Sequence, residues 1–316
     1  MGAASTPQPL VNVAVAVVQR SDGCVLLAER PHGKSSGGFW EFPGGKFEIT
    51  ENARQALARE VREEIGIEID RAYPWMTYEH AYPGKRVRLH FYRILAWHGT
   101  PHGREGQRVS WEDPQALGVG PLLPANERVL RALSLPALYA ITHARKYGVA
   151  AFMDKLRAAL KRGVQLIQVR EPEMTPEQLA QFARRVVVAA HAHGARVLIN
   201  GSMMIAQRAG ADGVHFQSRQ LQQLTAPPAL AFWAASCHNS AELARAAELH
   251  ASFAVLSPVL PTASHPGVPG MGWEKFAALT HHYPLPVYAL GGMRADMLET
   301  AMDHGAHGVA LLTGCW

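Results

Sequence analysis

The second part of the chain alternates regularly between short apolar segments and amphipathic stretches, and this alternation limits the fold more than any other feature. Eight strand-like segments follow one another: Leu138–Ile141, Gln165–Val169, Arg196–Ile199, Gly213–Phe216, Phe232–Ser236, Phe253–Ser257, Val287–Leu290 and Gly308–Leu312. Helical patterns separate most of them, for instance Phe152–Lys161, Pro176–His193 and Ser240–Leu249. Eight strands alternating with helices predict a closed (β/α)8 TIM barrel, and a doubly wound open sheet is the alternative.

The first part of the chain follows a different pattern, in which strand-like runs surround one long helix. Two apolar runs, Val11–Val18 and Cys24–Ala28, flank an Asp-Gly pair, which is a hairpin turn signal. A loop rich in glycine and proline follows at Pro31–Gly45, and a helical pattern then covers Glu51–Ile65 and stops at Gly66. Further strand-like runs and one short helix come later: Trp75–Ala81, Val87–Trp97, Val109–Trp111 and Asn126–Leu133.

Prolines around residue 134 mark the change between these two patterns. The chain has 316 residues, which agrees with two domains at roughly 150 residues per domain. We therefore predict one domain over residues 1–134 and a second over residues 135–316.

The composition excludes several other classes of protein. Hydrophobic residues make up 48% of the chain and charged residues 18%, which excludes an intrinsically disordered chain. The net charge is +5, but the chain has no basic block or arm, so we expect no stable binding of nucleic acid. Three scattered cysteines are too few for a disulfide framework, and the longest early apolar run, Val13–Val18, is far shorter than the roughly 20 residues of a membrane span. Since no secretory signal is visible, we expect a soluble cytoplasmic protein of open oligomeric state.

Three glutamates on the long predicted helix are the first candidate site. Glu60, Glu63 and Glu64 are spaced so that a helix places all three carboxylates on one face. Like charges packed together cost stability unless a cation lies among them, and hard oxygen ligands favour Mg²⁺ or Mn²⁺. Taken alone, the three residues could also form an ordinary solvated acidic face.

The spacing around these glutamates resembles the Nudix box, the signature of the Nudix hydrolases. Gly45 is followed after five residues by Glu51, and after seven more by the run Arg59–Ile67, which fits the box at every fixed position. The resemblance implies an α/β/α sandwich with a mixed sheet, and hydrolysis of a nucleoside diphosphate linked to another group by metal-assisted attack of water on phosphorus. It further implies that the three glutamates hold the divalent ions, that the backbone carbonyl of Gly44 helps them, and that Arg59 orients a glutamate.

A loop further along the chain offers one more carboxylate. Glu105 lies in the segment Gly103–Gln107, which resembles a loop with a metal-binding glutamate in the MutT branch of the Nudix family. Hydrolysis also requires a general base near the attacking water. Glu60 and Glu105 are the two candidates for this base.

The resemblance to the MutT branch extends to residues that would read the base of a nucleotide. Glu41 and Phe42 lie in a segment similar to the one that enters the catalytic helix of MutT, and Asn126 lies in a segment similar to its late purine-reading loop. An asparagine amide both donates and accepts hydrogen bonds, which suits a base edge. Arg30 falls where the family places a nucleotide-contacting arginine. The resemblance implies hydrolysis of 8-oxo-dGTP to 8-oxo-dGMP and pyrophosphate, although Phe42 could be a core aromatic, Arg30 a surface charge and Asn126 a helix cap.

The second part of the chain resembles the family of thiamine-phosphate synthase and TenI, a thiazole tautomerase. The matching segments include 168–171, 198–201, 236–238 and 289–292, which lie where barrel strands end and where barrel enzymes keep their chemistry. The resemblance implies a site for a phosphorylated thiazole-like ligand, formed by residues that follow these strands: Arg170, Asn200, His238, Gly291, Gly292 and Thr313.

Departures from the synthase pattern put its activity in question. Pro172 stands where a synthase normally has a lysine, and Asn200-Gly201 and Gln217-Ser218 stand where it has the carboxylates that hold Mg²⁺ and pyrophosphate. The Asn-Gly pair and His238 are closer to the TenI pattern, in which a histidine moves a proton. His238 could also be a structural histidine, and the glycines could serve only tight turns.

Three functions are compatible with these features. The first is an enzyme that removes oxidised nucleotides, with an attached TenI-like barrel. The second is a bifunctional thiamine-pathway protein whose first domain hydrolyses a pyrimidine or thiamine diphosphate. The third is a binding module that reads a damaged base, which the intact glutamates disfavour because a reader does not need them.

Overall fold

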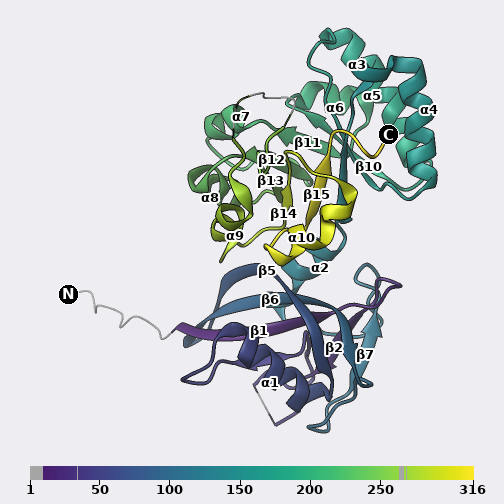
Figure 1. The fold of residues 1–316 in the computed structure, drawn as a ribbon. Coiled ribbons are helices and arrows are strands. Elements are labelled where there is room, and N and C mark those ends of the chain that lie inside the picture. The colour runs from purple at the N-terminus through teal and green to yellow at the C-terminus, as the bar shows by residue number, and fades with distance from the viewer. Residues whose placement is uncertain (1–9, 34, 263–266, 268) are drawn as a thin grey trace. The chain divides into compact units, whose positions relative to one another are not determined.

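The chain forms two compact units in the computed structural model, and most elements of each are labelled in Figure 1. The first unit comprises Met1–Ser134 and His281–Pro284, and the second comprises Leu135–Thr280 and Leu285–Trp316. The structure describes residues 10–33, 35–262, 267 and 269–316.

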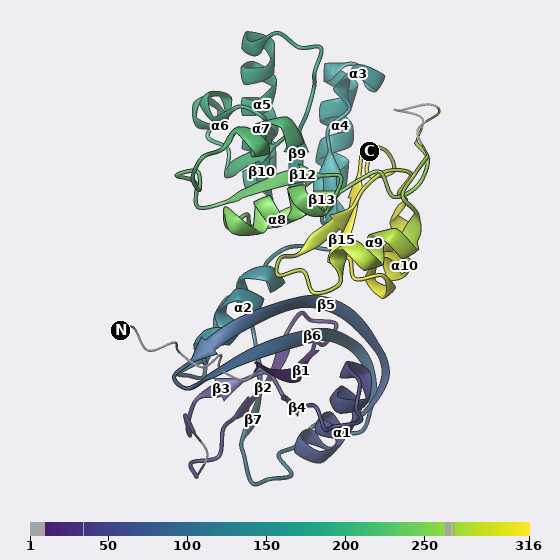
Figure 2. The same ribbon diagram turned by 90° about the vertical axis from the view of Figure 1, so that its left-hand side faces the viewer.

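The first unit contains a mixed four-stranded sheet in the order β4-β1-β6-β5. Its strands are β1 (Leu10–Val18), β4 (Gly44–Lys46), β5 (Glu68–Tyr82) and β6 (Lys85–His98). β1 pairs parallel with β6 and antiparallel with β4, while β5 and β6 form the long, curved antiparallel hairpin seen in Figure 2. A second, antiparallel sheet places β2 (Val25–Glu29) between β3 (Trp40–Glu41) and β7 (Val109–Glu112).

Hydrophobic cores lie on both faces of this central layer because the side chains of each strand alternate between the faces. In β1, Val15 and Val17 enter one core, whereas Ala14, Ala16 and Val18 enter the other. The first core also receives α2 (Glu127–Leu133), and the second receives α1 (Ala53–Ile65). The predicted α/β/α sandwich with a mixed sheet is thereby confirmed.

Helix α1 has defined signals at both ends. The side chain of Asn52 accepts hydrogen bonds from the backbone N–H groups of Arg54 and Gln55, and the Gln55 side chain accepts one from the Asn52 N–H in return. Gly66 ends the helix in a left-handed conformation with φ of 69°. The helix therefore starts two residues later than the predicted Glu51, and Glu51 lies outside it.

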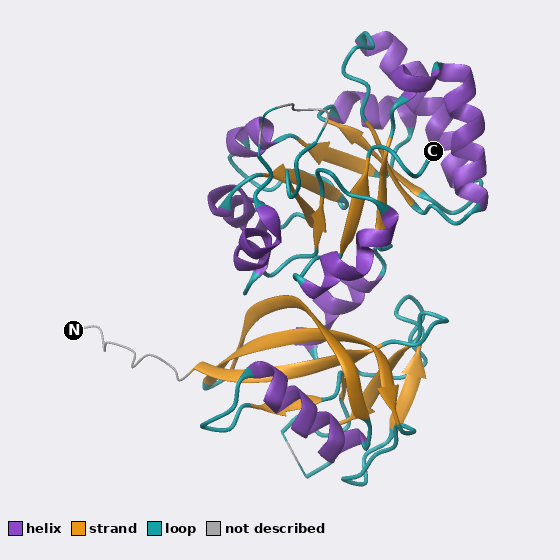
Figure 3. Cartoon of the chain, viewed as in Figure 1, coloured by secondary structure: helices purple, strands orange, loops and turns teal. Residues whose placement is uncertain are grey.

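The second unit is a closed parallel barrel in the order β10-β11-β12-β13-β14-β15-β8-β9, with helices outside the strands (Figure 3). The strands are β8 (Leu138–Ile141), β9 (Leu166–Val169), β10 (Arg196–Asn200), β11 (Gly213–Phe216), β12 (Trp233–Cys237), β13 (Phe253–Leu256), β14 (Val287–Ala289) and β15 (Gly308–Leu311). The helical elements are α3 (Ala144–Tyr147), α4 (Val149–Lys161), α5 (Pro176–His191), α6 (Met203–Ala209), α7 (Ser218–Gln223), α8 (Ser240–Glu248), α9 (Gly272–Thr280), η2 (Ala295–Met297) and α10 (Leu298–Asp303). All eight predicted strands are present, and the open-sheet alternative is wrong because β15 pairs with β8 and closes the ring.

Several predictions of single elements need correction. The strand predicted at Trp75–Ala81 runs over fifteen residues, Glu68–Tyr82, and two short strands, β3 and β4, lie inside the segment predicted as a loop. The helix predicted at Asn126–Leu133 is present as α2, starts one residue later, and is preceded by a 3-10 turn, η1 (Pro124–Asn126). No helix in the described part of the chain is long and apolar enough to cross a membrane.

Candidate active site

The glutamates of α1 lie against the glycines of β4. The backbone N–H of Gly44 donates to Glu64 Oε2 over 3.0 Å. The carboxyl group of Glu60 lies so close to Gly45 that a Cβ atom added there would be 2.1 Å from its carbon. A glycine at each position therefore lets the helix and its acidic side chains approach the strand.

The electrostatic field of this site is strongly negative. The pKa of Glu64 is raised to about 7, mainly by burial and in addition by the negative charges of Glu41, Glu60 and Glu105, while the hydrogen bond from Gly44 opposes the shift. Four carboxylates from α1, β3 and the loop after β6 thus converge within interaction range.

Glu60 lies in the same field. Burial raises its pKa, the nearby carboxylates of Glu63 and Glu105 add to this effect, and Arg59 opposes it.

Arg59 is the positively charged residue that binds several of these glutamates. Its guanidinium donates to Glu51 Oε1 and Oε2 over 2.7 and 2.9 Å, to Glu60 over 2.9 Å, to Glu63 over 3.1 Å and to the carbonyl of Lys46 over 3.0 Å. The bond to Arg59 is the main reason why the pKa of Glu51 falls to about 2. Arg59 therefore binds the carboxylates of Glu51, Glu60 and Glu63 at the same time.

The donor set suits a hard divalent cation. In the described residues, no three histidine, cysteine, aspartate or glutamate side chains are gathered in a way that could hold a metal ion, and Glu60 and Glu63 point to Arg59. Carboxylate oxygens are nonetheless the ligands that Mg²⁺ and Mn²⁺ prefer. A cation would also relieve the repulsion that raises the pKa of Glu60 and Glu64.

The residues expected to read a base lie around β3. Arg30 pairs with Glu41 over 2.5 Å, and Arg30 Nε donates to the carbonyl of Ser35. Phe42 is only 2% exposed and belongs to the core that α2 covers, so its ring is packed by protein. The structure therefore supports the interpretation of Phe42 as a core aromatic residue. Arg30 is paired with Glu41, one of the carboxylates near Glu64.

Asn126 is held close to β3 by its neighbours. The backbone N–H of Leu123 donates to the carbonyl of Trp40, and the hydroxyl of Tyr78 donates to the carbonyl of Ala125. Asn126 is 5% exposed, and its side chain makes no helix-capping bond, so the capping interpretation is wrong. The guanidinium of Arg128 lies 4.9 Å from the centre of the Tyr78 ring and fixes α2 to β5.

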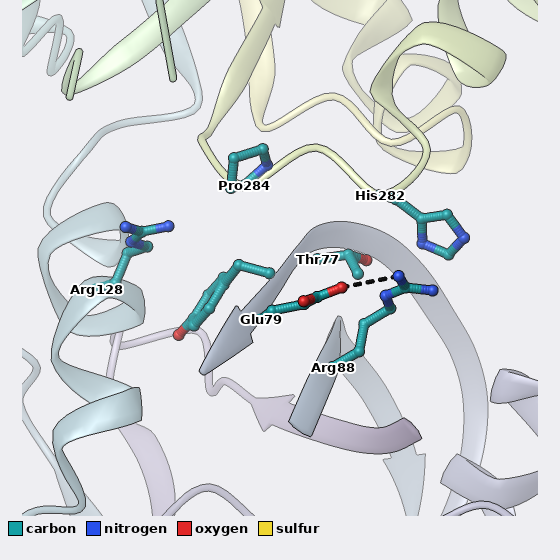
Figure 4. Close-up of a pocket in the computed structure, with 7 residues that line it drawn as sticks. Thr77, Glu79, Arg88, Arg128, His282 and Pro284 are labelled. Atoms are coloured by element: carbon teal, nitrogen blue, oxygen red, sulfur yellow. Dashed lines mark hydrogen bonds and ion pairs between the residues drawn. The ribbon is translucent and has the colours of Figure 1, made fainter. Parts of the chain in front are cut away.

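The hairpin β5–β6 carries a separate ion pair. Figure 4 shows Glu79 of β5 beside Arg88 of β6, at 2.8 Å, and Arg128 on α2. Arg86 also pairs with Glu79, so this carboxylate is engaged by two arginines. Glu79 is thus not available to the acidic group on α1.

The predicted barrel residues all follow strands at the carboxyl end of the barrel. Arg170 is exposed after β9, and the amide of Gln217 after β11 donates to Asn200 Oδ1 over 2.9 Å. His238 is exposed after β12, and its Nδ1 lies 2.8 Å from the carbonyl of Ser257. Gly291, Gly292 and Thr313 follow β14 and β15.

Two carboxylates near this end are occupied by structural hydrogen bonds. Glu171 accepts from the backbone N–H groups of Ala144 and Arg145, and Glu242 accepts from the N–H of His238. Both glutamates are buried. They hold backbone groups in place and are not placed like ligands of a metal.

Comparison with known proteins agrees with both halves of this description. A family model described as NUDIX domain matches residues 14–132, and one described as Thiamine monophosphate synthase matches residues 138–315. The chain belongs to both families.

Its Nudix part is 38% identical over 123 residues to the CTP pyrophosphohydrolase of Escherichia coli (39% of this chain, 90% of that protein). It is also 36% identical over 124 residues to the 8-oxo-dGTP diphosphatase of Haemophilus influenzae (39% of this chain, 91% of that protein). Its synthase-like part is 34% identical over 185 residues to the Putative thiamine-phosphate synthase 2 of Aquifex aeolicus (56% and 96%).

The comparisons therefore confirm that the chain contains a Nudix hydrolase domain and a thiamine-phosphate synthase-like domain. The names of the two Nudix relatives refer to different nucleotides, CTP and 8-oxo-dGTP. Family membership therefore does not determine the substrate of this Nudix domain.

Some residues of the structure's polar networks were not predicted from the sequence. Glu51 binds Arg59, and Gln107 bridges two backbone groups beside Glu105. Inside the barrel, Tyr139, Gln168 and His215 form a buried chain of hydrogen bonds. This network could have been predicted from the sequence, because its polar residues interrupt strands that are otherwise apolar.

Proposed function

We propose that the Nudix domain, residues 1–134, hydrolyses nucleoside triphosphates to the monophosphate and pyrophosphate, and that 8-oxo-dGTP is its preferred substrate. The observation that carries the proposal is the placement of Glu60 and Glu64 against the glycines of β4, with Glu41 and Glu105 close enough to act on the charge of Glu64. Such a group of carboxylates, kept intact with an orienting arginine, supports catalysis rather than simple binding.

The acidic residues have distinct parts in this proposal. Glu60, Glu63, Glu64 and Glu105, with the carbonyl of Gly44, would hold Mg²⁺ or Mn²⁺, which neutralises phosphate charge and lowers the pKa of a bound water. Arg59 keeps two of these carboxylates in place. Glu60 and Glu105 are the candidates for the general base, and Glu105 lies close enough to contribute to the raised pKa of Glu60.

Recognition of the base rests on Asn126 and on the pair of Arg30 and Glu41. The Asn126 amide offers one donor and one acceptor direction to a purine edge. Glu41, the partner of Arg30, lies on β3, and the segment before Asn126 is bonded to this strand, so the three residues belong to one region of the domain. This arrangement favours a substrate that carries a purine base over a substrate that has no base.

A panel of substrates tests the proposal. Release of pyrophosphate and of phosphate is measured with 8-oxo-dGTP, dGTP, CTP, ADP-ribose and thiamine diphosphate, in Mg²⁺ and in Mn²⁺. We expect the highest kcat/KM with 8-oxo-dGTP and release of pyrophosphate. Preference for CTP would overturn the choice of base, and preference for thiamine diphosphate would favour the thiamine-pathway function instead.

A single substitution tests the acidic site itself. Glu63→Gln removes one negative charge without a large change of shape, and we expect it to abolish turnover while circular dichroism shows an unchanged fold. Near-normal hydrolysis by this variant would contradict the metal assignment.

We also propose that the barrel binds a phosphorylated thiazole-like ligand at the carboxyl ends of its strands. The supporting observations are the exposed Arg170 after β9 and, at the ends of the neighbouring strands β10 and β11, the amide pair of Asn200 and Gln217, where the synthase pattern has carboxylates. His238 is oriented by the carbonyl of Ser257 and is suited to move a proton. Calorimetric titration with a thiazole phosphate, with and without Mg²⁺, tests this: we expect binding that does not depend on the metal, and no binding would refute it.

A further inference from the structure

The carboxyl end of α1 is closed by the loop that carries Glu105. The last carbonyl groups of a helix have no partner within it and need donors from elsewhere. The backbone N–H of His102 donates to the carbonyl of Ile65 over 3.0 Å, and that of Arg104 to the carbonyl of Glu64 over 2.9 Å. Arg104 Nη1 adds a bond of 3.0 Å to the carbonyl of Arg62. The loop is therefore bonded to the helix that bears the glutamates.

One side chain connects this helix end directly to Glu105. The Gln107 amide donates from Nε2 to the carbonyl of Glu64 over 2.9 Å. Its Oε1 accepts from the backbone N–H of Glu105 over 2.8 Å. A single rigid amide thus links the backbone of one acidic residue to the backbone of another.

The rest of the loop is folded tightly enough to make this bridge short. Gly103 approaches the carbonyl oxygen of Gln107 so closely that an added Cβ would lie 1.8 Å from it. Gly106 has a φ of 79°, which a residue with a side chain rarely adopts. The chain therefore turns back on itself around Glu105, whose side chain is otherwise exposed.

We propose that Gln107 is a positioning residue for the hydrolysis reaction, which holds Glu105 at a fixed place relative to Glu60 and Glu64. This inference rests on the proposed hydrolase function of the Nudix domain. The side-chain amide of Gln107 can donate to the Glu64 carbonyl and accept from the Glu105 N–H at the same time because it carries both an N–H donor and an oxygen acceptor. A carboxylate at this position lacks the donor, and an alanine lacks both groups.

The test compares Gln107→Ala and Gln107→Glu with a matched control, Arg104→Ala. The control also removes a hydrogen bond between this loop and the end of α1, but it leaves the N–H of Glu105 bonded. For both Gln107 variants we expect kcat with 8-oxo-dGTP to fall about tenfold or more with little change of KM, since placement of a general base is worth roughly 10²–10⁴-fold. For Arg104→Ala we expect kcat to stay within about twofold of wild type.

A double-mutant cycle shows whether Gln107 acts through Glu105. In the Glu105→Gln background we expect Gln107→Ala to cause no further loss of kcat, because the group that it positions is already absent. Multiplicative losses in the cycle, or equal activity of Gln107→Ala and Arg104→Ala, would overturn the proposal.

Hydrogen exchange separates this proposal from the proposed function. The amide of Glu105 should exchange faster in Gln107→Ala than in wild type, whatever nucleotide the enzyme accepts. Absence of hydrolysis by the wild type with every nucleotide would refute the function, whereas unchanged exchange of the Glu105 amide would refute the bridge.

Discussion

At the scale of single residues, the absence of one Cβ atom determines where a glutamate can lie. Gly45 has no side chain, and the carboxyl group of Glu60 occupies the space that a Cβ would fill. Because the obstructing atoms are the end of a flexible side chain, an alanine at this position would displace the carboxylate rather than the backbone.

We therefore predict that Gly45→Ala lowers kcat about 10- to 100-fold, since a displacement of about 1 Å can have this effect, while the melting temperature changes little. Gly33→Ala is the control, because a Cβ at Gly33 would meet no atom within 4 Å. Steady-state kinetics and thermal melts of both variants decide the matter, and a fully active Gly45→Ala enzyme would contradict the placement of Glu60.

A second prediction at this scale concerns His215 inside the barrel. Its ring lies between Ser236 Oγ, 2.8 Å from Nε2, and the hydroxyl of Tyr139, 3.2 Å from Nδ1. Burial lowers its pKa to about 3, so the ring is neutral in the folded state at ordinary pH. The unfolded chain, in contrast, binds a proton below its normal pKa of 6.5.

The sign of the pH effect follows from this difference. Below pH 6.5 only the unfolded state gains a proton, so the His215 contribution to the free energy of unfolding falls by about 1.4 kcal/mol per pH unit towards the folded pKa. We expect His215→Gln to be destabilised at pH 8 and the gap to wild type to shrink between pH 6.5 and 5. Chemical denaturation at several pH values measures this gap, and a gap independent of pH would contradict a neutral buried ring.

At the scale of elements, α1 shows what sequence patterns reveal and where they are insufficient. The run of apolar residues and the stop at Gly66 predicted its extent closely, and its capping box, Asn52 with Gln55, is a local signal that was available for the exact start. Its partners could not be predicted in this way. That Glu64 meets Gly44 and that Gln107 meets Glu64 depends on contacts between distant segments.

We predict that Asn52→Ala lowers the free energy of unfolding by about 1 kcal/mol, because two N–H groups at the start of α1 lose their acceptor. Asn52→Ser keeps a capping oxygen, and we expect its free energy of unfolding to stay within roughly a few tenths of a kcal/mol of the wild-type value. Urea denaturation of the two variants measures the difference, and equal stabilities would show that the cap contributes nothing.

Strand β5 illustrates the opposite case. Its first half was not predicted as a strand because charged residues and Pro74 break the alternation of apolar and polar side chains. The structure shows register shifts between Ile69 and Arg71, between Arg71 and Ala72, and between Pro74 and Thr77. The first and third of these shifts add one residue to β5 and move the following side chains to the other face, so a simple period of two fails although pairing with β6 continues.

At the scale of the whole molecule, the fold classes followed from periodicity, whereas the pairing order did not. The eight barrel strands are short and buried, so each could be recognised alone as an apolar run. Strands β3 and β4 contain two and three residues, and only pairing with β2 and β1 defines them. The glutamates of the candidate site were predicted from their spacing, whereas the bond between Glu64 and Gly44 of β4 could not be predicted in this way.

The two units have separate hydrophobic cores. Both cores of the first unit draw only on residues before position 134, and the aromatic core of the barrel, which includes Tyr139, Phe253 and Tyr288, draws only on later ones. A unit that contains its own core can fold without the other. We therefore propose that residues 1–134 and 135–316 are independent domains.

This proposal predicts the behaviour of the separated domains. Residues 1–134 expressed alone should hydrolyse the preferred nucleotide with a kcat/KM within about twofold of the full chain, because no residue of the acidic site comes from the barrel. Residues 135–316 alone should unfold cooperatively in a thermal melt, since their core is complete. Loss of more than about tenfold in kcat/KM by the isolated first domain, or a barrel that melts without a cooperative transition, would show that the domains depend on each other.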